Sequence, residues 1–143
     1  MILVDANLLL YAHHSQYQQH AAANRWLETQ LSSGMRIGLP WASILAFVRI
    51  STNPRAFASP QSIGTIWDVV HSWLANKRVW IPEPTERHAQ MLGELLISGN
   101  LGGKLVPDAH LAVLALEHGL VLCSSDGDFA RFGKLRWLNP LED

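Results

Sequence analysis

The chain has 143 residues, of which 48% are hydrophobic, and its formal net charge at pH 7 is −1. This length is enough for one domain with a substantial core, so we expect residues 1–143 to form a single domain. The near-zero charge excludes a protein that binds nucleic acid through its total charge, so any basic patch must be local. The single cysteine, Cys123, excludes an internal disulfide and a cysteine-based metal site.

The composition also bears on where the protein acts. No apolar run reaches the roughly 18 residues that a membrane-spanning helix needs. The chain starts with strand-like residues and has no basic leader region, so we expect no signal peptide and a cytoplasmic protein. We expect Cys123 to fill space in a buried strand.

Predicted strands and helices alternate along the chain. Short apolar runs predict strands at residues 1–4, 36–39, 79–81, 120–123 and 135–138. Apolar residues at helical spacing predict helices at 6–12, 20–31, 41–52, 59–74, 84–96 and 107–118. Asn7 and Thr85 are expected N-caps, and Ser32-Ser33-Gly34 is expected to end the second helix. This alternation predicts a three-layer α/β/α domain with a central parallel sheet, the first strand central and the last at an edge.

The segment from Pro107 to Phe129 contains the most informative residues. Pro107 favours a helix start, which places Asp108 in the first turn, where a negative charge suits the helix dipole. Gly119 is well placed just past the helix end. The next apolar run ends at Ser124, and Asp126 and Asp128 follow it. Ligands of open parallel sheets bind beyond the carboxyl ends of the strands, which is where we expect these two carboxylates.

Four aspartates are therefore predicted at one edge of the sheet. Asp5 follows the first strand, and Asp108, Asp126 and Asp128 come from the segment just described. Each has a structural alternative: Asp5 as a strand-end cap, Asp108 as a favourable first-turn residue, and Asp126-Gly127-Asp128 as a turn. Carboxylates packed together repel one another unless a cation lies among them. Oxygen ligands favour Mg²⁺ or Mn²⁺, which would activate water and neutralise charge on a phosphate.

Three segments resemble the acidic motifs of PIN-domain ribonucleases, and the similarity is closest to the VapC toxins of bacterial VapBC toxin–antitoxin systems. They are residues 4–9 (VDANLL), 107–112 (PDAHLA) and 124–129 (SSDGDF). Residues 47–54 (FVRISTNP), 129–132 (FARF) and 137–141 (WLNPL) are also similar to this group. The resemblance covers essentially the whole chain, in the order and compact length typical of the family.

The resemblance implies a magnesium-dependent endoribonuclease, with Mn²⁺ as an alternative ion, that leaves a 5′-phosphate and a 3′-hydroxyl. Asp5 and Asp108 would be the principal ligands, Asp126 would complete the site, and Asp128 would ligate directly or through water. Ser124 would occupy the family's Ser/Thr position near the scissile phosphate, and Asn7 its small polar position after the first Asp. Ser124 has the alternative of satisfying loop backbone groups, and Asn7 that of a helix cap. The implied partners are RNA, a VapB-like antitoxin and a second copy of the chain in a homodimer.

One position departs from the family pattern. Many such toxins carry a glutamate on the helix after the second strand, where this chain has Ala46 or Phe47. A site with one carboxylate fewer would bind metal more weakly, or hold one ion instead of two. Glu94 is a candidate replacement in space.

Other candidates come from basic and aromatic residues. Lys104 and Arg131, with Arg49 and Arg55, are candidates for RNA phosphate contacts, or are simply solvated. The scattered spacing of His13, His14 and His20 favours solvated surface over a zinc site. Most of the six tryptophans are expected in the core, and an exposed subset would suit an antitoxin groove or a dimer face.

Two rival functions stay open at this point. The first is a binding module whose weakened site no longer cleaves RNA, which the missing glutamate favours. The second is a metal-dependent phosphatase or DNA nuclease, because the same carboxylates would serve any phosphate ester.

Overall fold

A parallel sheet forms the centre of the computed structural model, which describes residues 1–33 and 35–142. Its strand order is β3-β2-β1-β4-β5, and each neighbouring pair is parallel. The predicted central place of the first strand and the edge place of the last are confirmed. The strands are β1 (Ile2–Val4), β2 (Ile37–Gly38), β3 (Val79–Trp80), β4 (Val121–Cys123) and β5 (Trp137–Leu138).

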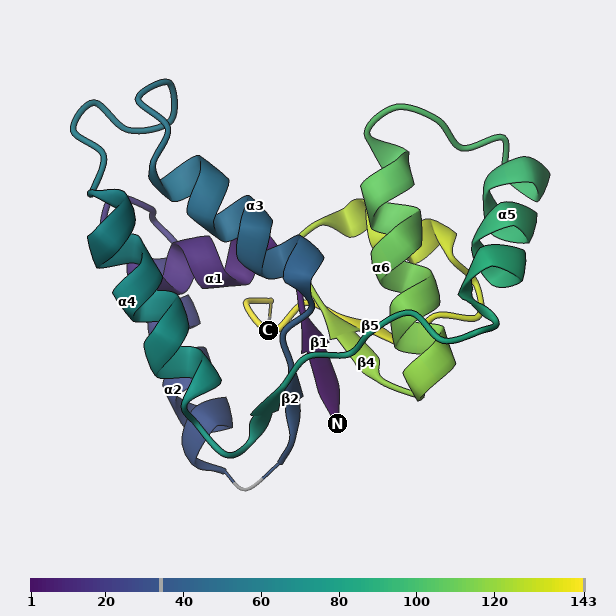
Figure 1. The fold of residues 1–143 in the computed structure, drawn as a ribbon, viewed down its shortest axis with the longest axis horizontal. Coiled ribbons are helices and arrows are strands. Elements are labelled where there is room, and N and C mark those ends of the chain that lie inside the picture. Colours follow the sequence, from purple (N-terminus) through teal and green to yellow (C-terminus); the bar gives the residue numbers. More distant parts are fainter. Residues whose placement is uncertain (34, 143) are drawn as a thin grey trace.

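Helices cover both faces of this sheet, which confirms the predicted three-layer α/β/α fold. In Figure 1, the first four helices lie on one side of the strands, and α5 and α6 lie on the other. The helices are α1 (Ala6–His13), α2 (His20–Ser32), α3 (Trp41–Ser51), α4 (Ile63–Leu74), α5 (His88–Ser98) and α6 (Leu105–His118). A 3₁₀ helix, η1 (Gly127–Arg131), follows β4.

Strand β1 divides the core into two parts because its side chains alternate between the two faces of the sheet. Ile2 and Val4 pack in the cluster that includes α1–α4, whereas Leu3 packs in the cluster of α6 and η1. Cys123 is 1% exposed in the first cluster, so the prediction that it is a buried apolar residue is confirmed. Burial raises the pKa of its thiol to about 12.

Several predicted helix starts were wrong. Asp5, not Asn7, caps α1, because its Oδ1 accepts the Ala6 N–H at 2.7 Å. Helix α4 begins at Ile63 after its cap Ser62, four residues later than the 59–74 pattern predicts. Helix α5 begins at His88, because Thr85 forms hydrogen bonds with Glu117 instead of capping this helix. Residues Ser32-Ser33-Gly34 were predicted to end the second helix. Helix α2 does end at Ser32, and Gly34 lies outside the described residues.

Helix α6 matches its prediction closely at both ends. It begins at Leu105, two residues before Pro107, and Asp108 is the acidic residue of its first turn. Pro107 is tolerated there because first-turn N–H groups have no intrahelical acceptor. At the other end, Gly119 adopts the left-handed conformation, with φ of 65°, that glycine accommodates without strain. Among the described residues, no helix is long and apolar enough to cross a membrane.

Candidate metal centre

The carboxyl ends of β1 and β4 lie side by side, and a polar network joins the residues that follow them. Val4 pairs with Cys123 in the sheet register, which brings Asp5 next to Ser124. The Ser124 hydroxyl donates to Asp5 Oδ2 at 2.8 Å and accepts from Asn7 Nδ2 at 3.1 Å and from the Asp126 N–H at 3.0 Å. Ser124 is fully buried, so its hydroxyl holds Asp5, Asn7 and the start of the next loop together.

Three more carboxylates converge beside this network. Asp108, Asp126 and Asp128 each offer an oxygen atom within 4.8 Å of the others. They come from the first turn of α6, the N-cap of η1 and the first turn of η1. Asp126 Oδ1 accepts the Asp128 N–H at 2.9 Å, which fixes these two side chains relative to each other. The structure thus brings these three predicted residues together in one group, whereas Asp5 lies outside it.

Mutual repulsion is visible in the titration of these groups. Burial raises the pKa of Asp108 to about 6, with the negative charges of Asp126, Asp5 and Asp128 adding to the effect. Burial also raises the pKa of Asp5; the bonds from Ser124 and Ala6 act against that shift, and the charge of Asp126 adds to it. Asp5 is therefore electrostatically coupled to the group of three, even though the Ser124 and Ala6 hydrogen bonds engage its oxygens.

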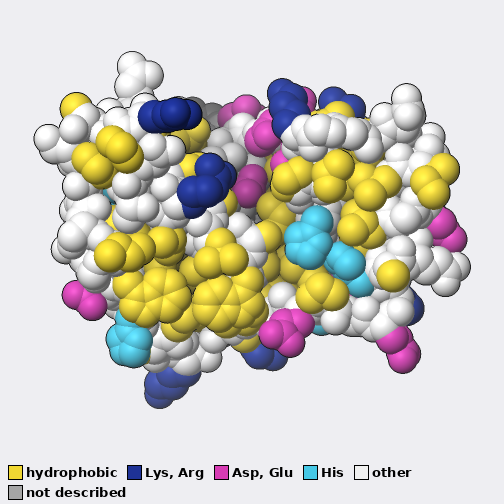
Figure 2. Space-filling model, turned by 45° about the horizontal axis from the view of Figure 1, so that its top comes forward, with side chains coloured by type: hydrophobic (Ala, Val, Ile, Leu, Met, Phe, Trp, Pro, Cys, Tyr) yellow, Lys and Arg dark blue, Asp and Glu magenta, His cyan; other side chains and the backbone are white. Residues whose placement is uncertain are grey.

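Two cations lie near the outer carboxylate of the group. Lys104 Nζ is 3.8 Å from Asp128 Oδ2, and Arg131 Nη2 is 3.7 Å from Asp128 Oδ1. Both separations are long, and the Lys104 side chain is 86% exposed, so these ion pairs are loose. Figure 2 shows acidic and basic side chains gathered at the hollow between the two halves of the molecule.

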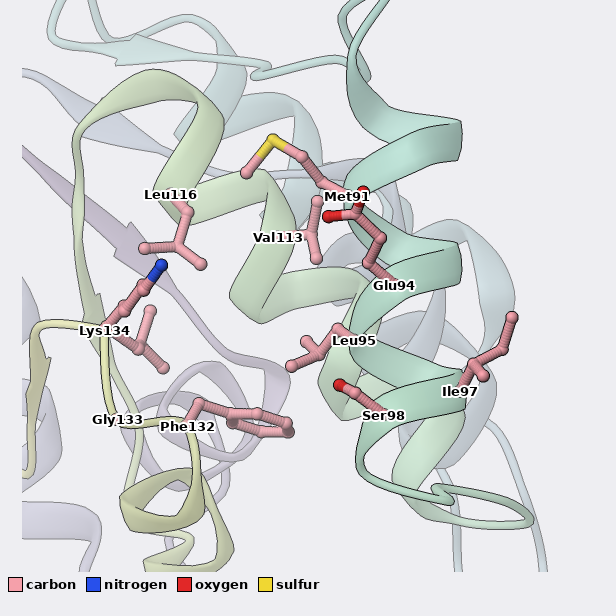
Figure 3. A pocket seen from close by; sticks show the side chains of 11 residues that line it. Met91, Glu94, Leu95, Ile97, Ser98, Val113, Leu116, Phe132, Gly133 and Lys134 are labelled. Carbon is pink, nitrogen blue, oxygen red and sulfur yellow. The ribbon is translucent and has the colours of Figure 1, made fainter.

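Of the two candidate positions for the missing glutamate, Ala46 is partly buried, and Phe47 belongs to the core. Phe47 is fully buried, and its ring centroid is 4.8 Å from that of Trp73. Glu94 is not among the grouped carboxylates. It lies in α5 and lines a cavity of about 750 Å³ with Val113 and Phe132, as Figure 3 shows. Among the described residues, no acid from α3 or α5 joins the group.

Three further features differ from the predictions or were missed by them. His14 was wrongly predicted to lie on the surface: it is 4% exposed, and its Nε2 lies 2.8 Å from the Ser51 hydroxyl oxygen. The pair between His88 and the buried Glu117 was not predicted. The two residues are 29 positions from each other in the sequence. Both are polar residues in apolar helices, but nothing else in the sequence marks them as partners. Of the tryptophans, Trp73 is buried, whereas Trp41 and Trp67 are exposed.

The donor atoms of the group match one class of cation. All are carboxylate oxygens, which suit Mg²⁺ or Mn²⁺ better than zinc or copper. Burial, with the charges of the neighbouring carboxylates, raises the pKa of Asp108, and a divalent cation there would stabilise its ionised form. The described residues therefore fit a hard divalent ion, which in other proteins polarises water and stabilises charge on a phosphate.

Comparison with known proteins places the chain in a family. The PIN domain model matches residues 2–135. The chain is 41% identical over 140 residues to Ribonuclease VapC37 of Mycobacterium tuberculosis, covering 98% of this chain and 97% of that protein. It is 37% identical over 142 residues to Ribonuclease VapC43 of the same organism, covering 99% and 97%.

Solved structures share the fold. VapC20 of Mycobacterium tuberculosis, described as a sarcin–ricin loop cleaving toxin, superposes with a TM-score of 0.70 at 16% identity over 93% of this chain and 95% of that one. VapBC2 from Rickettsia felis, bound to promoter DNA, superposes with a TM-score of 0.67 at 19% identity over 97% and 98%. The family match and the full-length relatives together show that this chain belongs to the PIN-domain family, in the VapC group.

Proposed function

We propose that this protein is the toxin of a type II toxin–antitoxin system and a metal-dependent endoribonuclease that hydrolyses RNA phosphodiester bonds. The observation that carries the proposal is the convergence of Asp108, Asp126 and Asp128 at the edge of the sheet, next to Asp5. Support for RNA as the substrate comes from full-length relatives that are named ribonucleases. Mg²⁺ is the ion that we propose, with Mn²⁺ as a substitute.

Each residue has a proposed role at this site. Asp108, Asp126 and Asp128 hold the cation, and Asp5 completes its surroundings directly or through water. Bound Mg²⁺ would supply a polarised water and neutralise charge on the reacting phosphate. Ser124 and Asn7 orient Asp5 through the hydrogen bonds described above. Lys104 and Arg131, loosely held at Asp128, contact RNA phosphates.

The test is cleavage of RNA by the purified chain with Mg²⁺, with EDTA, and after Asp108→Asn. We expect activity only with the metal, and a loss of about 100-fold or more in the variant, because a ligand and a negative charge are removed. Asp68→Asn is the matched control, because Asp68 is an exposed aspartate in α4, on the other side of the sheet.

Equal activity of the wild-type chain and Asp108→Asn, both correctly folded, would contradict the proposal. Offering single-stranded DNA and a small phosphomonoester under the same conditions separates an RNA nuclease from the other phosphate-ester hydrolases. A chain that binds RNA and metal but does not cleave would support the alternative of a non-cleaving module. The absence of a glutamate at Ala46 or Phe47 is the observation that favours this alternative.

A VapB-like antitoxin is the proposed partner. Support comes from structural neighbours that were solved as toxin–antitoxin complexes. The chain also has exposed apolar side chains on neighbouring helices, on the side where Figure 2 shows hydrophobic side chains gathered: Trp41 and Leu45 on α3, and Ile63 and Trp67 on α4. We name these four residues the α3–α4 patch and assign it to the antitoxin.

Co-expression with a VapB-like antitoxin tests this assignment. Trp67→Ala and Leu45→Ala should weaken the complex and leave the toxin folded. A complex that both changes leave unaffected would place the antitoxin elsewhere. We also propose that the chain is a homodimer, and light scattering of the isolated chain measures its oligomeric state. We propose further that residues 1–143 are one domain, which a single cooperative unfolding transition would support.

A further inference from the structure

Two imidazole rings from different helices meet on the α5–α6 side of the molecule. His88 is the first residue of α5, and His110 lies in α6. His88 Nε2 is 3.0 Å from His110 Nδ1. The rings are inclined by 71°, with their centroids 4.9 Å apart, so nitrogen edges face each other and the ring faces do not stack.

Glu117 fixes the orientation and the proton of His88. Its side chain is fully buried, and its Oε2 lies 2.5 Å from His88 Nδ1. Its Oε1 accepts the Thr85 N–H at 2.9 Å and the Thr85 hydroxyl. Burial acts to raise the pKa of Glu117, but the bonds from Thr85 and His88 together outweigh it, and the pKa is lowered. An ionised carboxylate only accepts, so His88 Nδ1 donates to Glu117, and His88 Nε2 is the nitrogen that faces His110.

The spacing of the two nitrogens is close to that of a metal site. Two zinc–nitrogen bonds of about 2.0 Å at a tetrahedral angle place their nitrogens about 3.3 Å apart. The observed 3.0 Å is a hydrogen-bond distance, so to bind one cation the rings must move apart by about 0.3 Å and turn until both nitrogen lone pairs point at it. Binding through Nδ1 requires the lone pair of that atom, so a neutral His110 then carries its one ring proton on Nε2.

The surroundings also fit a metal ligand. In metalloproteins, a ligating histidine commonly donates its other ring N–H to a carboxylate, which is the arrangement of Glu117 and His88. Imidazole nitrogens favour zinc-class cations, whereas the all-oxygen group of Asp108, Asp126 and Asp128 favours magnesium. Figure 2 shows histidine side chains reaching the surface near the hollow, on the side where α6 lies.

We propose that His88 and His110 form a binding site for one transition-metal cation of the zinc class, with Glu117 as the outer partner of His88 and water in the remaining positions. The bound cation joins the start of α5 to α6. With two protein ligands, the site binds more weakly than a structural four-ligand zinc site.

The first test is a titration of the wild-type chain with zinc chloride in the presence of excess Mg²⁺, followed by the ¹⁵N shifts of the histidine side chains. We expect His88 Nε2 and His110 Nδ1 to shift together and to saturate before the other five histidines respond. If both rings stay unchanged up to the zinc concentration at which other histidines respond, the proposal is wrong. This measurement needs no variant, so it holds even where a variant fails to fold.

The second test compares thermal unfolding with and without zinc chloride. We expect zinc to raise the Tm of the wild-type chain and of two controls, and not that of His110→Gln. The first control is His118→Gln, on the same helix, whose ring instead bonds the Glu83 carbonyl oxygen. The second is Asp108→Asn, which disrupts the acidic group. A zinc response that survives His110→Gln, or that is lost in Asp108→Asn, would overturn the assignment. Neither outcome depends on whether the chain cleaves RNA.

Discussion

On the α1–α4 side of the sheet, the buried His14 has a neutral partner, the Ser51 hydroxyl, whereas on the α5–α6 side the buried His88 faces the carboxylate of Glu117. The same division holds for other groups: Phe47 fills the first side, and Asp108 lies at the edge of the second. The first side therefore gives its buried histidine a neutral partner, and the second collects carboxylates for which a cation is the natural partner.

The largest effect is expected from Phe47→Ala. Removing a fully buried ring should lower the free energy of unfolding by about 3–5 kcal/mol, because a cavity opens beside Trp73. Chemical denaturation measures this, with Leu45→Ala as the control, because Leu45 is 57% exposed on the same helix. Metal affinity per folded molecule should not change; if it falls, the α1–α4 side is not independent of the acidic group.

Ser124→Ala should affect both stability and cleavage. It removes three hydrogen bonds and leaves Asp5 without its hydroxyl donor, so we expect a loss of about 1–3 kcal/mol in stability. Cleavage should fall by about 10-fold or more, because Asp5 is no longer held in place. Ser125→Ala, at the neighbouring less buried position, is the control. An unchanged cleavage rate in a folded Ser124→Ala variant would show that Asp5 needs no orientation from this hydroxyl.

Lowering the pH should change the contributions of His14 and Asp108 to the free energy of unfolding in opposite directions. Burial, with the charges of His13 and His20, lowers the pKa of His14 to about 4, so the unfolded chain takes up this proton first as the pH falls below 6.5. The stabilising contribution of neutral His14 is complete above pH 6.5 and is lost as the pH falls towards 4. The raised pKa of Asp108 acts in the opposite direction, because protonation removes a negative charge that burial and the neighbouring carboxylates disfavour in the folded state.

The comparison of wild type with His14→Gln isolates the histidine from this opposing effect. Glutamine does not titrate, so the stability difference between the two chains should shrink by about 1–2 kcal/mol between pH 7 and pH 4.5. Urea unfolding at several pH values measures it, with His13→Gln as the control. A difference that stays constant over this range would mean that His14 is already protonated, or remains neutral, in both states.

The smallest effect is expected from Lys104→Ala. This side chain is 86% exposed and lies 3.8 Å from Asp128, so its loss should change stability by no more than about 0.5 kcal/mol. If it contacts RNA, KM should rise a few-fold, and the salt dependence of RNA binding should weaken. Lys77→Ala, a lysine outside this region, serves as the control. A change in kcat without a change in KM would place Lys104 at the reaction and not at the binding of RNA.

Sequence patterns predicted the features that depend on local order along the chain. The alternation of apolar runs gave the sheet, and Asp5, Asp108 and Asp126 could be located because each directly follows a strand or starts a helix. The helix starts at Ile63 and His88 were missed because prolines before them mark helix starts only loosely. The His14–Ser51 and His88–Glu117 pairs join residues 37 and 29 positions apart, and no periodicity encodes such contacts.

The one thiol of the molecule sits in the sheet itself. Cys123 pairs with Val4 in the central strand and is shielded from solvent, with its ionisation suppressed. An alkylating reagent can therefore reach it only after β4 separates from its neighbours. The rate at which Cys123 is alkylated would therefore report how often the centre of the sheet opens, and the wild-type chain needs no added label for this measurement.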